Sequence, residues 1–170
     1  QFESLMAEQR RTFENILPEL MALHKLRGSK GELKYYEGPE GIKNVYESTL
    51  RSLKSGDTYF LISSYKDIEQ MAPEWLEDFI SRRAKKNLDA RLIFLNDERG
   101  HLNKRMEQAW NQKVRLMSHP LPFKPNLLTT PSRFVLYSTD TPASAVVIEN
   151  PDIIAMQREL FLYIWNSLPE

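Results

Sequence analysis

Cysteine is absent from the 170 residues, and histidine occurs only three times. The absence of cysteine excludes disulfides, thiolate nucleophiles and thiolate metal ligands, and it is usual in a reducing compartment, so we expect a cytoplasmic protein. No two of the three histidines share the spacing of a metal site. The sequence therefore predicts no metal centre and no cofactor.

Glycine is also scarce, and its six residues form neither of the glycine-rich motifs that cradle phosphates, G-x-G-x-x-G and G-x-x-x-x-G-K. The G-x-S-x-G motif of serine hydrolases is missing as well. His101 and Lys104 are one position too far apart for the H-x-K pair of a phosphodiesterase. We therefore name no catalytic residue and predict that the chain is not an enzyme.

Neither sign of charge is in excess, because 23 lysines and arginines balance 23 aspartates and glutamates. A surface that neutralises many phosphates normally needs a basic excess, so this chain alone is not expected to grip DNA. No apolar run approaches the roughly 20 residues that a membrane-spanning helix requires, so we expect no membrane partner.

The one concentration of basic residues comprises Arg82, Arg83, Lys85 and Lys86. It ends a predicted helix whose first turns are acidic. That arrangement complements the helix dipole and allows Asp78 to pair with Arg82. We interpret these residues as a solvated helix face rather than a nucleic-acid patch.

A heptad pattern extends over residues 1–27, which contain no glycine. Pro18 removes one backbone donor near the middle, so a straight helix is not expected. Two interpretations stay open: a helix that pairs with a second copy, and a single amphipathic helix packed on its own domain. In the first, the dimer interface is the apolar seam Phe2, Met6, Phe13, Ile16, Leu20 and Leu23.

Residues 28–31 are typical of a hinge, and strand-like and helix-like segments alternate after them. The continuous apolar run 92–95 is typical of a strand buried on both faces, as in parallel sheets. We predict an α/β domain over residues 32–170, with a mixed, mainly parallel sheet and flanking helices. The predicted strands are 32–36, 58–63, 90–95 and 114–117, and the predicted helices are 39–54, 65–86 with a restart at Pro73, and 98–112.

The second half of the chain has a different character. Four prolines between residues 119 and 132 predict an irregular loop. Residues 134–137 and 145–148 are expected to form a hairpin, followed by a helix that Asn150 caps and Pro151 begins. The apolar face of this helix is expected to consist of Ile153, Leu160, Phe161, Ile164 and Leu168.

Polar side chains follow several of the predicted strands. Open parallel sheets bind ligands beyond the carboxyl ends of their strands, so these side chains form a candidate ligand cleft. They fit equally the role of helix caps and loop polar groups, and both interpretations stay open. The candidates are Glu37, Ser63, Ser64, Tyr65, Asn96, Asp97, Arg99 and His119.

The most distinctive segment is K-Y-Y-E-G-P-E-G-I-K-N-V-Y-E-S-T-L, residues 34–50, followed by the strand D-T-Y-F-L-I-S-S. Near the end of the chain come A-V-V-I-E-N-P and F-L-Y-I-W, residues 145–151 and 161–165. Together these segments resemble the effector region of TrmB-type transcriptional regulators. Their specificity is structural, because none of them carries a catalytic group.

This resemblance implies a phospholipase D-like fold that has lost its catalytic pair, preceded by a dimerising linker helix and a winged helix-turn-helix DNA reader. Residues 1–27 correspond to the linker, and the DNA reader lies outside this sequence. On this hypothesis the protein is a homodimer that senses a small-molecule effector and contacts DNA only through the reader. The extra C-terminal domain of the sugar-binding members is missing here, so a sugar ligand is not carried over.

Two other functions stay open. One is a phosphodiesterase or nuclease of the phospholipase D type with an atypical site near His119. The other is a dimeric scaffold without a regulatory role, which a DNA reader upstream would argue against.

Overall fold

The computed structural model describes residues 31–118, 124 and 126–170. The predicted dimerising helix, with all six interface residues, lies outside the described residues, as does His119. In chain order the elements are β1 (Glu32–Glu37), α2 (Gly38–Ser52), β2 (Thr58–Ser63), α3 (Tyr65–Met71), α4 (Pro73–Ala84), β3 (Asp89–Leu95), α5 (Glu98–Arg105), β4 (Lys113–Met117), β5 (Asn126–Thr129), β6 (Phe134–Ser138), β7 (Ser144–Glu149) and α6 (Pro151–Ser167).

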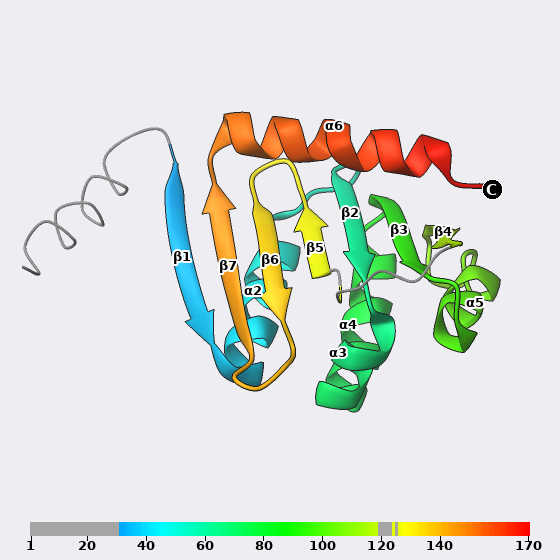
Figure 1. Cartoon of the computed structure of the whole chain (residues 1–170), viewed down its shortest axis with the longest axis horizontal. Coiled ribbons are helices and arrows are strands. Elements are labelled where there is room, and N and C mark those ends of the chain that lie inside the picture. Colours follow the sequence, from blue (N-terminus) through cyan, green and yellow to red (C-terminus); the bar gives the residue numbers. More distant parts are fainter. Residues whose placement is uncertain (1–30, 119–123, 125) are drawn as a thin grey trace, which may run out of the picture.

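A seven-stranded sheet with the order β1-β7-β6-β5-β2-β3-β4 forms the centre of the domain (Figure 1). β2, β3 and β4 pair in parallel, and the other four neighbouring pairs are antiparallel. The α/β class, the mixed sheet and the flanking helices are therefore confirmed. The expectation that parallel pairing predominates is wrong, because short connections join β5, β6 and β7, and such connections can join only antiparallel strands.

Helices α2, α3 and α4 cover one face of the sheet and enclose the larger core. The apolar stripe of α2 is buried as its spacing predicts, with Ile42, Val45 and Leu50 no more than 3% exposed. Gly38 has a φ of +74°, a conformation that glycine adopts without steric cost, and Pro39 then occupies the first turn. These two residues set the direction in which α2 leaves β1.

Helix α6 runs across the upper end of the sheet in Figure 1 and covers part of the opposite face. Asn150 caps it by accepting hydrogen bonds from two backbone amides, as predicted. Its buried residues are Ile154, Phe161 and Trp165. The expected face is confirmed in part, because Phe161 is buried and Ile164 and Leu168 pack against the same core, whereas Leu160 is 49% exposed. Apolar residues occupy both stripes, so the sheet, and not the periodicity, decides which one is buried.

Two expected boundaries are also wrong. The predicted loop 119–132 contains the strand β5, which pairs with β2 and β6. Prolines on either side of these four residues favoured the prediction of a loop, so β5 was not predicted. The helix predicted over 98–112 ends at Arg105, and the following residues continue as turns up to β4, with Asn111 at a φ of +48°.

Candidate functional site

The polar residues that follow β2 lie inside the domain rather than in a cleft. Ser63 is 1% exposed and Ser64 is 8% exposed. The Tyr65 ring packs edge to face against Phe94 with the centroids 5.8 Å apart, and burial raises the pKa of its hydroxyl to about 12. These three residues of the candidate cleft therefore belong to the core, where the Ser63 hydroxyl and the Ser64 amide both donate to Asn126 Oδ1.

Three of the remaining candidates follow β3 at the same edge of the sheet as Ser63, and Glu37 lies apart from them. Asp97 accepts a hydrogen bond from the Gly100 amide at 2.8 Å, so it is the N-cap of α5. Arg99 forms an ion pair with Glu69 of α3 at 2.9 Å, and Asn96 is exposed. Glu37 ends β1, four strands from β2 and thus roughly 19 Å away across the sheet. The structure does not bring the seven described candidates together into one cleft.

A chain of buried hydroxyl and amide groups crosses the sheet instead. The Tyr46 hydroxyl of α2 donates to the Tyr137 hydroxyl of β6 at 2.8 Å. The Ser63 hydroxyl lies 2.9 Å from Tyr137 and donates to Asn126 Oδ1 at 2.9 Å. All four residues are at most 7% exposed. The chain forms because β5 runs antiparallel to β2, which places Asn126 beside the end of β2.

Replacing Tyr137 with phenylalanine tests this chain. Burial raises the pKa of Tyr137 from 10 to about 12, so its contribution to stability is complete below pH 10 and is lost as the pH rises through 12. Tyr137→Phe should cost about 1 to 2 kcal/mol at neutral pH, because Tyr46 and Ser63 lose a partner. Urea unfolding between pH 7 and about pH 11 should then show a shallower alkaline decline in the variant than in wild type. Parallel curves would contradict the assignment.

An open groove of about 360 Å³ lies next to this chain, over β5, β6 and β7. Its apolar floor includes Leu127, Leu136 and Val146, and Leu136 is 37% exposed. Its polar groups include Lys124, Asn126, Ser138 and Ser144. A groove of this size with an apolar floor and a few polar groups suits a small organic ligand.

Lys124 is the charged residue of the groove and joins two acidic groups. Its Nζ lies 2.8 Å from Asp140 Oδ1 and 3.4 Å from Asp67 Oδ1. The other carboxylate oxygen of Asp67, Oδ2, is buried without a hydrogen-bond partner among the described residues. Asp67 Oδ2 is therefore an acceptor without a described partner at this end of the sheet, close to the half-exposed ammonium group of Lys124.

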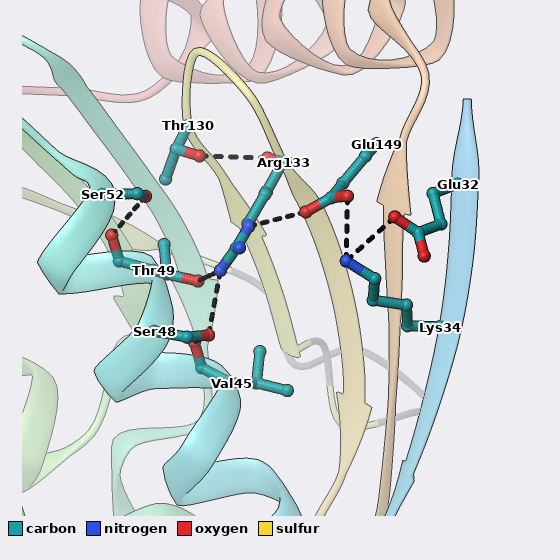
Figure 2. Close-up of polar contacts among 9 residues, drawn as sticks. All are labelled: Glu32, Lys34, Val45, Ser48, Thr49, Ser52, Thr130, Arg133 and Glu149. Carbon is teal, nitrogen blue, oxygen red and sulfur yellow. Dashed lines mark hydrogen bonds and ion pairs between the residues drawn. The ribbon is translucent and has the colours of Figure 1, made fainter. Parts of the chain in front are cut away.

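A second polar cluster lies at the other end of β6 and β7 (Figure 2). Arg133 Nε donates to Glu149 Oε1 at 2.9 Å, and Lys34 Nζ of β1 lies 3.1 Å from Glu149 Oε2. The Arg133 guanidinium also reaches α2, where it donates to the hydroxyls of Ser48 at 2.9 Å and Thr49 at 3.3 Å. The edge strand β1 is thereby tied to β7, to the turn before β6 and to α2.

Acid should weaken this cluster. Burial disfavours the charged form of Glu149, but its hydrogen bonds and attraction to Lys34 and Arg133 outweigh burial and lower its pKa below 4.5. The stabilisation is thus complete above about pH 4.5 and is lost as the pH falls through the lowered pKa.

Glu149→Gln should unfold about 1 kcal/mol more easily than wild type at pH 7, and this difference should shrink towards pH 3. Urea unfolding as a function of pH measures it. Glu159→Gln is the control, since Glu159 is 67% exposed and pairs only with its neighbour Arg158 among the described residues. A difference that does not change with pH would contradict the role of the Glu149 charge.

Several of these residues escaped the sequence analysis. Lys124 and Asn126 lie in the segment expected to be an irregular loop. Arg133 is an isolated cation whose partners are 16 and 85 residues away. One signal was available: Arg83 follows Phe79 and Ile80 at helical spacing, so it lies on the inner face of α4, and it is only 4% exposed. The expectation of a solvated basic face is wrong at this position.

The basic segment is otherwise as expected. Arg82 is paired with Asp78 at 2.6 Å, and also with Glu47 at 2.6 Å. Over the described ranges no group of three or more His, Cys, Asp or Glu side chains is placed to hold a metal. The helices in that part of the chain are all too short or too polar to cross a bilayer.

No protein-family model and no curated protein matches the sequence. Solved structures do match. TrmBL2, an archaeal chromatin protein with a novel mode of DNA binding, aligns with 99% of this chain at 14% identity and a TM-score of 0.58. The chain spans 66% of that protein, just under two thirds.

Two bacterial proteins have a similar fold. Nuc from Salmonella typhimurium, a phospholipase D family member, aligns with 82% of this chain and 97% of its own at 15% identity and a TM-score of 0.60. NucT from Helicobacter pylori covers 81% of this chain and 98% of its own at 9% identity and a TM-score of 0.57. The chain therefore has the phospholipase D-like fold that the sequence resemblance implied.

Proposed function

We propose that this chain is the dimerising and effector-sensing part of a prokaryotic transcriptional regulator that binds DNA through a separate winged helix-turn-helix. The observation that carries the proposal is the extent of the fold likeness. TrmBL2 accounts for 99% of the chain, whereas Nuc and NucT account for 82% and 81%. The H-x-K pair is missing from the sequence, which supports a binding role over a catalytic one.

The groove over β5, β6 and β7 is the effector site that we propose. It replaces the cleft that the sequence suggested, because its apolar floor and polar groups lie together on one surface. At its mouth, Lys124 offers a half-exposed cation that is paired with Asp67 and Asp140. A ligand with both apolar and polar parts, such as a sugar or phosphosugar, fits this combination.

The contacts around α2 supply a route by which the groove could affect a dimer. Tyr46 of α2 takes part in the hydroxyl chain that reaches Asn126 in the groove. One turn away, Ser48 and Thr49 bind Arg133, which is linked through Glu149 to Lys34 of β1. β1 follows the predicted pairing segment after the short segment 28–31, so we expect a ligand that favours one position of α2 to favour one dimer geometry.

Thermal unfolding in the presence of sugars and phosphosugars tests the effector site. A ligand present at 100 times its dissociation constant stabilises the folded state by about 2.7 kcal/mol. Val146→Trp, which fills the floor of the groove, should abolish the shift. Leu33→Trp is the control, because it adds the same bulk at an exposed site of β1 that does not line the groove. A shift that survives in Val146→Trp would place the ligand elsewhere.

Phosphodiester hydrolysis is the second candidate, and the likeness to Nuc favours it. An atypical site near His119 would then hydrolyse a generic substrate such as bis(4-nitrophenyl) phosphate. Turnover that is lost in His119→Ala would support this candidate. Absence of turnover by wild type would leave the regulatory role.

A further inference from the structure

Arg83 is a buried cation in the last turn of α4. The residue is 4% exposed, and its guanidinium lies over the Tyr59 ring, 5.3 Å from the centroid. One terminal nitrogen donates to Gln112 Oε1. Its Nε is buried and has no hydrogen-bond partner among the described residues.

No carboxylate of the described residues forms an ion pair with Arg83, whereas its neighbour Arg82 has two acidic partners. Burial lowers the pKa of Arg83, but an arginine still keeps its charge at any ordinary pH. Burial also raises the pKa of Tyr59, so this phenol is neutral and supplies no negative charge. The ring and the end of the helix dipole compensate the cation only partly.

Arg83 lines a cavity of about 30 Å³ within the larger core. Each residue that lines it is at most 9% exposed, so the cavity is internal. A cavity of this size has room for a water molecule or a small ion. The polar side chains around it are Arg83, Tyr46, Tyr59, Tyr65, Ser63, Asn103 and Tyr137, several of which carry hydroxyl donors.

We propose that this cavity binds a single monovalent anion of the size of chloride, held by the Arg83 guanidinium and the hydroxyls of Tyr59 and Tyr65, which take no part in the hydroxyl chain from Tyr46 to Asn126. A water molecule would satisfy the free N–H but would leave the buried charge uncompensated, and an unpaired buried charge costs several kcal/mol. An anion would accept the hydrogen bond from the free N–H and would also compensate the charge of Arg83. The cavity shares Tyr46, Ser63 and Tyr137 with the hydroxyl chain, but the proposal does not rest on the regulatory role.

Urea unfolding in potassium chloride and in potassium gluconate at equal ionic strength tests the proposal. Gluconate is too large for the cavity. Above the dissociation constant, each tenfold increase in chloride should lower the unfolding equilibrium constant about tenfold relative to gluconate. Equal unfolding constants in the two salts would show that the cavity holds water or nothing, and would overturn the proposal.

Two variants assign the effect to Arg83. Arg83→Met removes the cation with little change in volume, and it should lose the difference between chloride and gluconate. Arg158→Met is the matched control, because Arg158 is 53% exposed and its removal changes the net charge equally. It should keep the difference. If Arg83→Met does not fold, the line width of the chloride-35 NMR signal is measured with wild type and with Arg158→Met. Broadening by both proteins is expected, and the absence of broadening would contradict the site.

Discussion

Ile16→Asp should convert the proposed dimer into a monomer. The heptad pattern places Ile16 in the middle of the predicted seam, so the substitution would remove two isoleucines per dimer from that seam. Each such side chain contributes roughly 1.5 to 3 kcal/mol, so the dissociation constant should rise by roughly 10² to 10⁴. Light scattering at low micromolar concentration measures the change.

Ala22→Asp is the matched control for this prediction. On a helix with 3.6 residues per turn, position 22 lies opposite the seam, so the same charge should leave the dimer intact. A dimeric Ile16→Asp would show that the pairing seam is misassigned. The alternative, a single helix packed on its own domain, would then account for the apolar pattern.

Gly100→Ala should destabilise the domain by about 3 kcal/mol, near the upper end of the cost of overpacking. A Cβ at this position would lie 2.1 Å from the backbone oxygen of Leu95 and 3.0 Å from Leu116 Cδ2. The Leu95 carbonyl belongs to the backbone of β3 and cannot change rotamer as a side chain can. Helix α5 must therefore shift to relieve the contact. The Asp97 cap on the Gly100 amide and the Arg99 pair with Glu69 should weaken with it.

The comparison for Gly100 is Gly41→Ala in α2. There the nearest contact of an added Cβ would be Tyr36 Cβ at 3.2 Å, which a shift of a few tenths of an ångström relieves. Alanine also favours the helix by about 0.5 to 1 kcal/mol, so this variant should stay within about 1 kcal/mol of wild type. Equal urea midpoints for the two variants would contradict the tight contact between α5 and β3.

Much of the fold could be predicted because local pattern and burial agree in the first half of the chain. The run Leu92 to Leu95 is apolar because β3 lies between the strands β2 and β4 and is covered by helices. Pro73 marks the start of α4 by its own backbone geometry, whatever surrounds it. β5 could not be predicted in this way. Its four residues become a strand only through pairing with β2 and β6, which are distant in sequence.

The candidate site was harder to predict than the fold for the same reason. Ser63 was selected because it follows a strand, and it does join a polar network. Its partners Asn126 and Tyr137 come from antiparallel strands 63 and 74 residues later, and no local pattern specifies that register. At Arg83, in contrast, the local pattern was informative, because its helical spacing from Phe79 and Ile80 indicated burial. Its charge led to the wrong interpretation as a solvated residue.

The central claim is the proposal that this chain pairs two DNA readers and controls their geometry, and the DNA affinity of the proposed full-length regulator tests it. Fluorescence anisotropy at one fixed salt concentration, with Ile16→Asp and Ala22→Asp compared, measures it. Two linked readers gain roughly 10² to 10⁴ in affinity over one, so Ile16→Asp should bind its operator at least about 100-fold more weakly, while Ala22→Asp binds normally. Equal affinity of the two variants would contradict the account.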